Sequence, residues 1–115
     1  MNMLVAEYRS LPAAGERLSD PIVARKLEIV RALDEEANLD PVSRLLLDLL
    51  RDATEPDPVR AEAIEVVGLY IDESSALWQE LFHEVLRIHR DPAAGEALKQ
   101  AAEPYAVFLT ETLGT

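Results

Sequence analysis

The side chains that could carry out chemistry are few and poorly grouped. His83 and His89 lie six residues apart on one expected helix, which leaves no geometry for a Ser-His-Asp arrangement. The four glycines form no phosphate-binding loop, and the absence of cysteine excludes thiolate metal sites and cysteine nucleophiles. Glu35 and Glu36 could act as a general acid only inside an apolar cleft, but their polar neighbours indicate a solvated position. These residues predict a protein that is not an enzyme and holds no cofactor.

The charge balance indicates what kind of partner the chain can meet. The sequence has 22 acidic and 11 basic residues, for a net charge of −11. Such a charge repels nucleic acid and anionic membranes, and it speeds the encounter with a basic protein. The longest stretch without a formal charge, 104–110, is far shorter than the roughly 20 apolar residues of a membrane span. The N-terminal residues lack the positively charged region that begins a signal peptide, so we expect a soluble, cytoplasmic protein rather than a secreted one.

The pattern along the chain predicts one all-α domain. The 115 residues are 49% hydrophobic but only 5% aromatic, so the core must be aliphatic. No segment alternates with a period of two, whereas helical spacing occurs almost throughout. Asp-Pro occurs at 20–21, 40–41, 57–58 and 91–92. Because Asp favours the N-cap and Pro the first helical position, each pair predicts a helix start.

From these starts the sequence predicts helices over 3–11, 21–36, 41–53, 58–71, 75–90, 92–102 and 104–113. We expect Pro104 to end the sixth of them, because the residue before a proline avoids the helical region. The short linkers favour antiparallel neighbours.

The helices repeat in pairs. Pro21 aligns with Pro58 at an offset of 37 residues, and Pro58 aligns with Pro92 at an offset of 34. The intervening segments 44–51 and 80–87 align at an offset of 36. Self-similarity at this period, with one helical hairpin per unit, is typical of an α-solenoid. The predicted units are 3–36, 41–71 and 75–103, followed by a C-terminal capping helix over 104–113.

The best of these units resembles a HEAT repeat. It has a leucine-rich first helix at 45–52, an Asp/Pro turn at 55–58, and a second helix at 59–68 that begins Val-Arg-Ala and carries a late Gly. The resemblance implies a short right-handed α–α superhelix of about three HEAT-like hairpins; a compact helical bundle is the alternative. The arginine that joins neighbouring repeats through an aspartate in this family is matched by Arg60 alone, since Val23 and Ala94 occupy the equivalent positions.

The resemblance also bears on metal binding. HEAT-type hydroxylases bind iron through several His-Glu pairs at equivalent positions of successive repeats. This chain has the single pair His83 and Glu84, which aligns with Leu47 and Asp48. We therefore expect no metal site.

In HEAT-like hairpins the second helices line the concave side, which here would be acidic. The candidate protein-binding residues on this inner face are Glu28, Glu62, Glu65, Glu96 and Glu103. Those on one edge of the array are Glu35, Glu36, Asp72 and Glu73, since the offset of 37 places the two turns at equivalent positions. This arrangement predicts a non-enzymatic protein-interaction module or scaffold that binds a basic segment of a partner.

Two alternative functions and two structural questions stay open at the level of the sequence. The chain could be an inhibitor or immunity-type protein that masks a cationic partner, or a structural assembly subunit. Trp78 could belong to the core or be an exposed binding anchor. The apolar terminal helices could cap the array, or one exposed end could dock on a second copy and form a homodimer.

Overall fold

Every regular element of the structure is a helix. The computed structural model describes residues 2–12 and 19–113, with side chains up to residue 111, and this part of the chain contains no strand. The elements are α1 (Met3–Ser10), α2 (Asp20–Ala32), the 3₁₀-helix η1 (Asp34–Glu36), α3 (Asp40–Arg51), α4 (Asp57–Leu69), α5 (Ala76–Arg90) and α6 (Glu96–Leu113). The all-α prediction is confirmed. The predicted helix ends at 36, 53 and 71 extend two to four residues too far.

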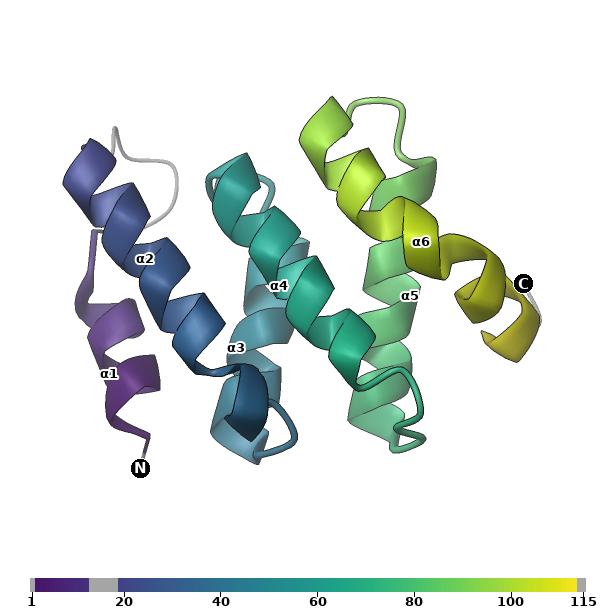
Figure 1. Cartoon of the computed structure of the whole chain (residues 1–115), viewed down its shortest axis with the longest axis horizontal. Helices are drawn as coiled ribbons and strands as arrows, with labels where there is room; N and C mark the ends of the chain where they lie inside the picture. Colours follow the sequence, from purple (N-terminus) through teal and green to yellow (C-terminus); the bar gives the residue numbers. More distant parts are fainter. Residues whose placement is uncertain (1, 13–18, 114–115) are drawn as a thin grey trace.

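The helices lie in two layers (Figure 1). α2, α4 and α6 lie side by side in one layer, and α1, α3 and α5 form the other. Each helix of the second layer pairs with the next one along the chain, which gives three helical hairpins. The shortest dimension of the molecule is 17 Å, the thickness expected of two packed helices. The first and the last hairpin therefore form the two ends of the longest dimension.

Three of the four Asp-Pro pairs begin a helix, although not in the predicted way. Asp20, Asp40 and Asp57 are the first residues of α2, α3 and α4. The N-cap is the residue before each of them, and its side chain makes no capping hydrogen bond. The aspartates therefore act through their charge at the positive end of the helix dipole. The prediction for 91–92 is wrong: Asp91 ends α5 and accepts a hydrogen bond from the Ala93 amide (2.9 Å), which closes a turn before α6.

The predicted break at Pro104 is also wrong. α6 runs without interruption from Glu96 to Leu113 with Pro104 inside it, so no separate capping helix over 104–113 exists. An internal proline costs about 3 kcal/mol. Buried side chains on both sides of Pro104 pack into the same core and offset this cost: Leu98, Ala101 and Ala102 before it, Ala106 and Leu109 after it.

The core between the two layers is aliphatic, as the composition predicts. Leu45, Leu46, Leu50 and Ile64 are at most 2% exposed. Trp78 is buried as well and stacks on Tyr70, with 5.3 Å between ring centroids. Trp78 thus belongs to the core, and the alternative of an exposed anchor is wrong.

We predict that Gly68→Leu destabilises the fold more than Ala61→Leu. A Cβ on Gly68 would overlap the ring of Tyr105, which packs against α4 and donates a hydrogen bond to Glu65 Oε2 (3.0 Å). Ala61 is on the same helix but is partly exposed, so a larger side chain there can reach solvent. Thermal unfolding followed by circular dichroism measures the difference. Equal losses for the two variants would contradict the close packing of Tyr105 on Gly68.

Candidate protein-binding surface

The inner-face acids predicted from the sequence lie on α2, α4 and α6, but most already have a partner. We call Glu28, Glu62, Glu65, Glu96 and Glu103 the acidic face. Glu62 pairs with Arg31 Nε (3.4 Å), and Glu103 pairs with the His89 ring. Glu65 accepts the hydrogen bond from the Tyr105 hydroxyl described above, and burial together with this contact raises the pKa of Tyr105.

Glu28 shares a cation with another carboxylate. Arg25 Nη1 lies 3.1 Å from Glu28 Oε2, and two other guanidinium nitrogens of Arg25 bind Glu7 on α1. The hydrogen bonds from Arg25 lower the pKa of Glu7. The side-chain amide of Gln100 donates to Glu96 at 3.5 Å. Two acids of the acidic face, Glu28 and Glu62, therefore pair with arginines, and the contacts of Glu62 and Glu65 join neighbouring helices of the layer.

The edge acids form a different kind of surface. Figure 1 shows the α2–α3 and α4–α5 connections on the same edge of the molecule. The Tyr70 hydroxyl donates to the Asp34 carbonyl (2.6 Å) and joins the two connections. We call Asp34, Glu35, Glu36, Asp72 and Glu73 the acidic edge. Among the described residues, no basic side chain pairs with any of the five, although Asn2 Nδ2 donates to Glu36 (3.0 Å).

The distribution of charge sets this edge apart. The α1, α3 and α5 layer carries five acidic and five basic residues, so its net charge is zero. The α2, α4 and α6 layer carries eight acidic and five basic residues, for a net charge of −3. The acidic edge alone contributes −5 of the total of −11. Almost half of the net negative charge thus lies in these two turns, more than the whole α2, α4 and α6 layer carries.

Exposed apolar side chains accompany the acidic edge. Leu39, in the α2–α3 connection, is 49% exposed, and Leu69, at the end of α4 beside Tyr70, is 66% exposed. Met3 is also exposed and follows Asn2, whose side chain reaches Glu36. The edge therefore offers both negative charge and apolar surface. Sequence reasoning missed these residues, although an isolated leucine directly before Asp-Pro at position 39 is a usable signal.

A second feature that the sequence analysis missed is a buried polar cluster. Lys26 Nζ lies 3.2 and 3.3 Å from the two oxygens of Glu55, and the Tyr8 hydroxyl donates to Glu55 Oε2 (2.8 Å). Lys26 is 1% exposed and also lies over the Tyr8 ring, 5.0 Å from its centroid. Burial and the Glu55 carboxylate raise the pKa of Tyr8. The signal for the cluster was the place of Lys26 within the apolar stripe of Ile22, Ile29, Val30 and Leu33.

This buried cluster lies beside an open hollow of about 230 Å³ whose walls include Leu45, Asp48 and Asp52. Every charged group of the cluster already has its partner inside the protein, and no buried side-chain nitrogen or oxygen among the described residues lacks one. The cluster joins α1, α2 and the α3–α4 turn. Its chemistry is therefore that of a structural link rather than that of a catalytic centre.

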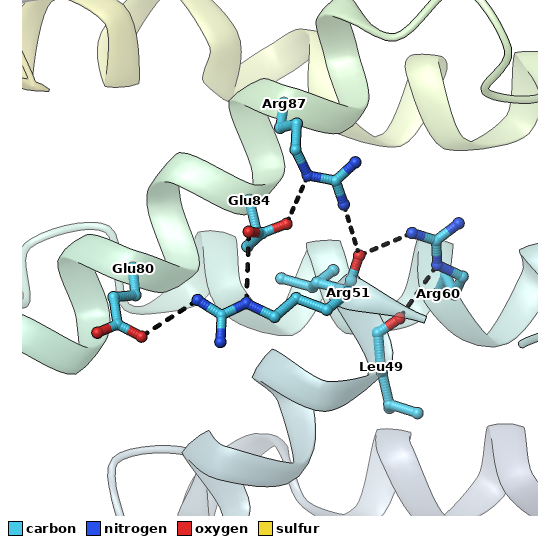
Figure 2. Close-up of polar contacts among 7 residues, drawn as sticks. Leu49, Arg51, Arg60, Glu80, Glu84 and Arg87 are labelled. Atoms are coloured by element: carbon cyan, nitrogen blue, oxygen red, sulfur yellow. Dashed lines mark hydrogen bonds and ion pairs between the residues drawn. The ribbon is translucent and has the colours of Figure 1, made fainter. Parts of the chain in front are cut away.

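Arg60 also has a structural role, which Figure 2 shows. Its Nε donates to the Leu49 carbonyl (3.0 Å) and its Nη2 to the Leu50 carbonyl (2.7 Å), at the C-terminal end of α3. Arg87 of α5 donates to the same Leu50 carbonyl (3.2 Å) and binds Glu84. Burial lowers the pKa of Arg60. The HEAT resemblance implied a bridge from Arg60 to an aspartate; its hydrogen bonds go to main-chain carbonyls instead.

The His83 and Glu84 pair is not arranged as a metal site. His83 is exposed on α5, and Glu84 is held by Arg51 (3.4 Å) and Arg87 (2.7 Å). Within the described ranges, no group of three or more metal-ligating side chains comes together. None of the helices over these ranges combines the length and the apolar character that crossing a bilayer requires.

Comparison of the chain with models of protein families, with curated proteins and with solved structures gave no match, so the geometry of the acidic edge is the evidence that bears on function.

Proposed function

We propose that this protein is a non-enzymatic interaction module that binds a basic, partly apolar segment of another protein along the acidic edge. The observation that carries the proposal is the set of five carboxylates without a cationic partner in the described chain, gathered in two turns that Tyr70 joins. Leu39 and Leu69 supply apolar surface beside them. A segment with Lys or Arg interspersed with large apolar residues complements both properties.

The arrangement of the helices supports a HEAT-like scaffold for this function. Three hairpins lie in sequence order, with their second helices side by side, and equivalent connections fall on one edge. Stacked repeats of this kind present equivalent positions in a row, and binding surfaces are built from such rows. The right-handed superhelix and the concave inner face stay predictions of this proposal.

The proposal differs from the sequence-based expectation in where it places the partner. Acidic residues that already pair with Arg25, Arg31 or His89 would have to give up those contacts before binding a new cation. The carboxylates of the acidic edge carry no such cost. The edge should therefore contribute more affinity than the face for each charge.

We expect the variant E35Q/E36Q/D72N/E73Q to bind a fluorescent Lys/Leu-rich peptide at least about tenfold more weakly than the wild type, since exposed ion pairs contribute about 0.2–1 kcal/mol each. Its binding should also depend less on salt. Fluorescence anisotropy at several salt concentrations measures both effects. The matched control, D20N/E28Q/E96Q/E103Q, removes the same charge from exposed positions on α2 and α6.

The control variant should lose clearly less affinity than the edge variant. Equal losses for the two variants would show that net charge alone drives the binding and would reject the edge as the site. Affinity purification followed by mass spectrometry, repeated at high salt and with the edge variant, then identifies the natural partner. A single partner held very tightly would favour the inhibitor alternative over a scaffold.

A further inference from the structure

The open hollow beside the buried polar cluster has the character of a small ligand pocket. It has a volume of about 230 Å³ and lies between the end of α1, the C-terminal half of α3 and the α3–α4 turn, with Lys26 of α2 in its wall. At the roughly 30 Å³ that a water molecule occupies in the liquid, this volume holds about seven groups of the size of a methylene. That is room for a short alkyl chain with a polar end.

Apolar side chains form much of the wall of this hollow, and they are held in place without a ligand. The apolar members are Leu11, Pro12, Leu45 and Leu49. Both leucines of α3 are only 2% exposed and belong to the core. The wall also includes Tyr8, whose hydroxyl is held by the buried Glu55. The hollow is therefore largely preformed, as small-molecule sites usually are.

The charges around the hollow leave one carboxylate without a counter-charge. Arg9 pairs with Asp48 (2.9 Å). Lys26 pairs with Glu55 (3.2 Å). The remaining charged residue of the lining is Asp52, and no basic side chain within the described ranges forms an ion pair with it. The lining therefore has a net charge of −1, and it belongs to a single group.

Asp52 offers one carboxylate oxygen to a ligand. It is the C-cap of α3, and its Oδ1 accepts hydrogen bonds from the amide (3.0 Å) and the hydroxyl (2.5 Å) of Thr54. These bonds lower the pKa of Asp52, so the carboxylate is ionised at neutral pH. A guanidinium fork matches two carboxylate oxygens, whereas an ammonium is a point charge that one oxygen can accept. The oxygen that Thr54 leaves free therefore favours an ammonium ion.

We propose that this hollow binds a primary alkylammonium ion, with the alkyl chain against the leucines and the ammonium on Asp52. The net charge of −11 raises the local concentration of such cations. The site is separate from the acidic edge, because Figure 1 shows the α3–α4 turn and the acidic edge at opposite ends of α3. A lysine side chain of a partner protein and a free aliphatic amine present the same chemistry to the hollow.

Titration of the ¹⁵N-labelled protein with pentylammonium, followed by two-dimensional NMR, tests this site. Saturable shifts should centre on the amides of Leu49, Asp52 and Thr54. Methylammonium has the same charge without the longer chain, so it should bind at least about tenfold more weakly. Equal affinities would mean that net charge alone attracts the amine and would overturn the proposal. Shifts centred on the acidic edge, or no saturable shifts at all, would also overturn it.

Two matched variants test the role of Asp52. Asp52→Asn should weaken pentylammonium binding at least about tenfold, because it removes the charge while the amide oxygen can still accept from Thr54. Asp91→Asn is the control: Asp91 is the C-cap of α5 and accepts from the Ala93 amide in the equivalent turn, but arginines line the hollow beside it. This control should change the affinity by no more than about twofold, since a distant exposed charge is screened. Equal weakening by both variants would contradict the site.

A lysine analogue distinguishes the two sources of the ammonium ion. Nα-acetyl-lysine N-methylamide carries the same alkylammonium on a peptide backbone. Binding as tight as that of pentylammonium would support a lysine of a partner protein as the occupant, and clearly weaker binding would support a free amine. Binding of pentylammonium that appears only in the variant Arg17→Gln would show that the chain supplies its own cation, and would overturn the proposal.

Discussion

Glu55→Ala should lower the free energy of unfolding by about 3–5 kcal/mol, because it leaves the ammonium of Lys26 buried without a counter-charge. Lys26 is 1% exposed, and the two oxygens of Glu55 are its charged partners. The same change deprives the Tyr8 hydroxyl of its acceptor. Urea unfolding followed by circular dichroism measures the loss. Glu73→Ala removes an exposed carboxylate and should change stability by no more than about 0.5 kcal/mol.

A second variant separates the buried charge from other effects of the truncation. In the double variant K26M/E55Q the ammonium is gone, and the amide oxygen of the substituted side chain can still accept the hydrogen bond from Tyr8. Replacing a buried ion pair by uncharged groups of similar volume is often neutral or stabilising. The double variant should therefore recover most of the stability that Glu55→Ala loses. A loss below about 1 kcal/mol for Glu55→Ala would show that the ammonium finds solvent, contrary to its burial.

Arg60→Met is expected to lower the free energy of unfolding by about 3 kcal/mol, since hydrogen bonds from a charged donor contribute about 1.5–3 kcal/mol each. The last carbonyls of a helix have no partner within the helix, and Arg60 satisfies two of them at the end of α3 (Figure 2). The guanidinium lies in the core, so water does not readily replace it.

Arg87→Met is the matched control for Arg60→Met. Arg87 donates to the same Leu50 carbonyl, but its side chain is half exposed and solvent can take its place. We expect it to cost less than about 1 kcal/mol. Urea unfolding of both variants gives the comparison, and amide exchange at the end of α3 locates the effect. Similar losses for the two arginines would mean that burial does not set the strength of these contacts.

The sequence was a good guide wherever local rules and packing agree. Three Asp-Pro pairs and helical periodicity were enough to place α2, α3 and α4. The same rules failed at Pro92 and Pro104 for opposite reasons. At Pro92 the Asp91 side chain stabilises a turn, whereas at Pro104 the burial of Leu98 and Leu109 on one face keeps the helix intact. The residues at each proline do not by themselves show whether a local preference or tertiary packing decides the structure there.

The sequence predicted which acidic residues lie on one edge but not which acidic residues pair with basic side chains. The alignment of equivalent turns placed Glu35, Glu36, Asp72 and Glu73 on one edge, which is where the structure has them. The pairing of Glu62 with Arg31 could not be foreseen, because the two residues meet only when α2 and α4 pack together. The role of Lys26 was missed because its partner Glu55 lies 29 residues away in the α3–α4 turn, and helical spacing alone does not bring the two together.

The hydrogen bond from Tyr70 to Asp34 has a thermodynamic consequence. It holds together two groups of like charge that lie far apart in the unfolded chain. The native state therefore contains electrostatic repulsion that the denatured state largely lacks, and dilute buffer should favour unfolding. A polycation that occupies the edge relieves the repulsion and binds the native form selectively, so its presence should raise the melting temperature in proportion to the logarithm of its concentration once the site is saturated.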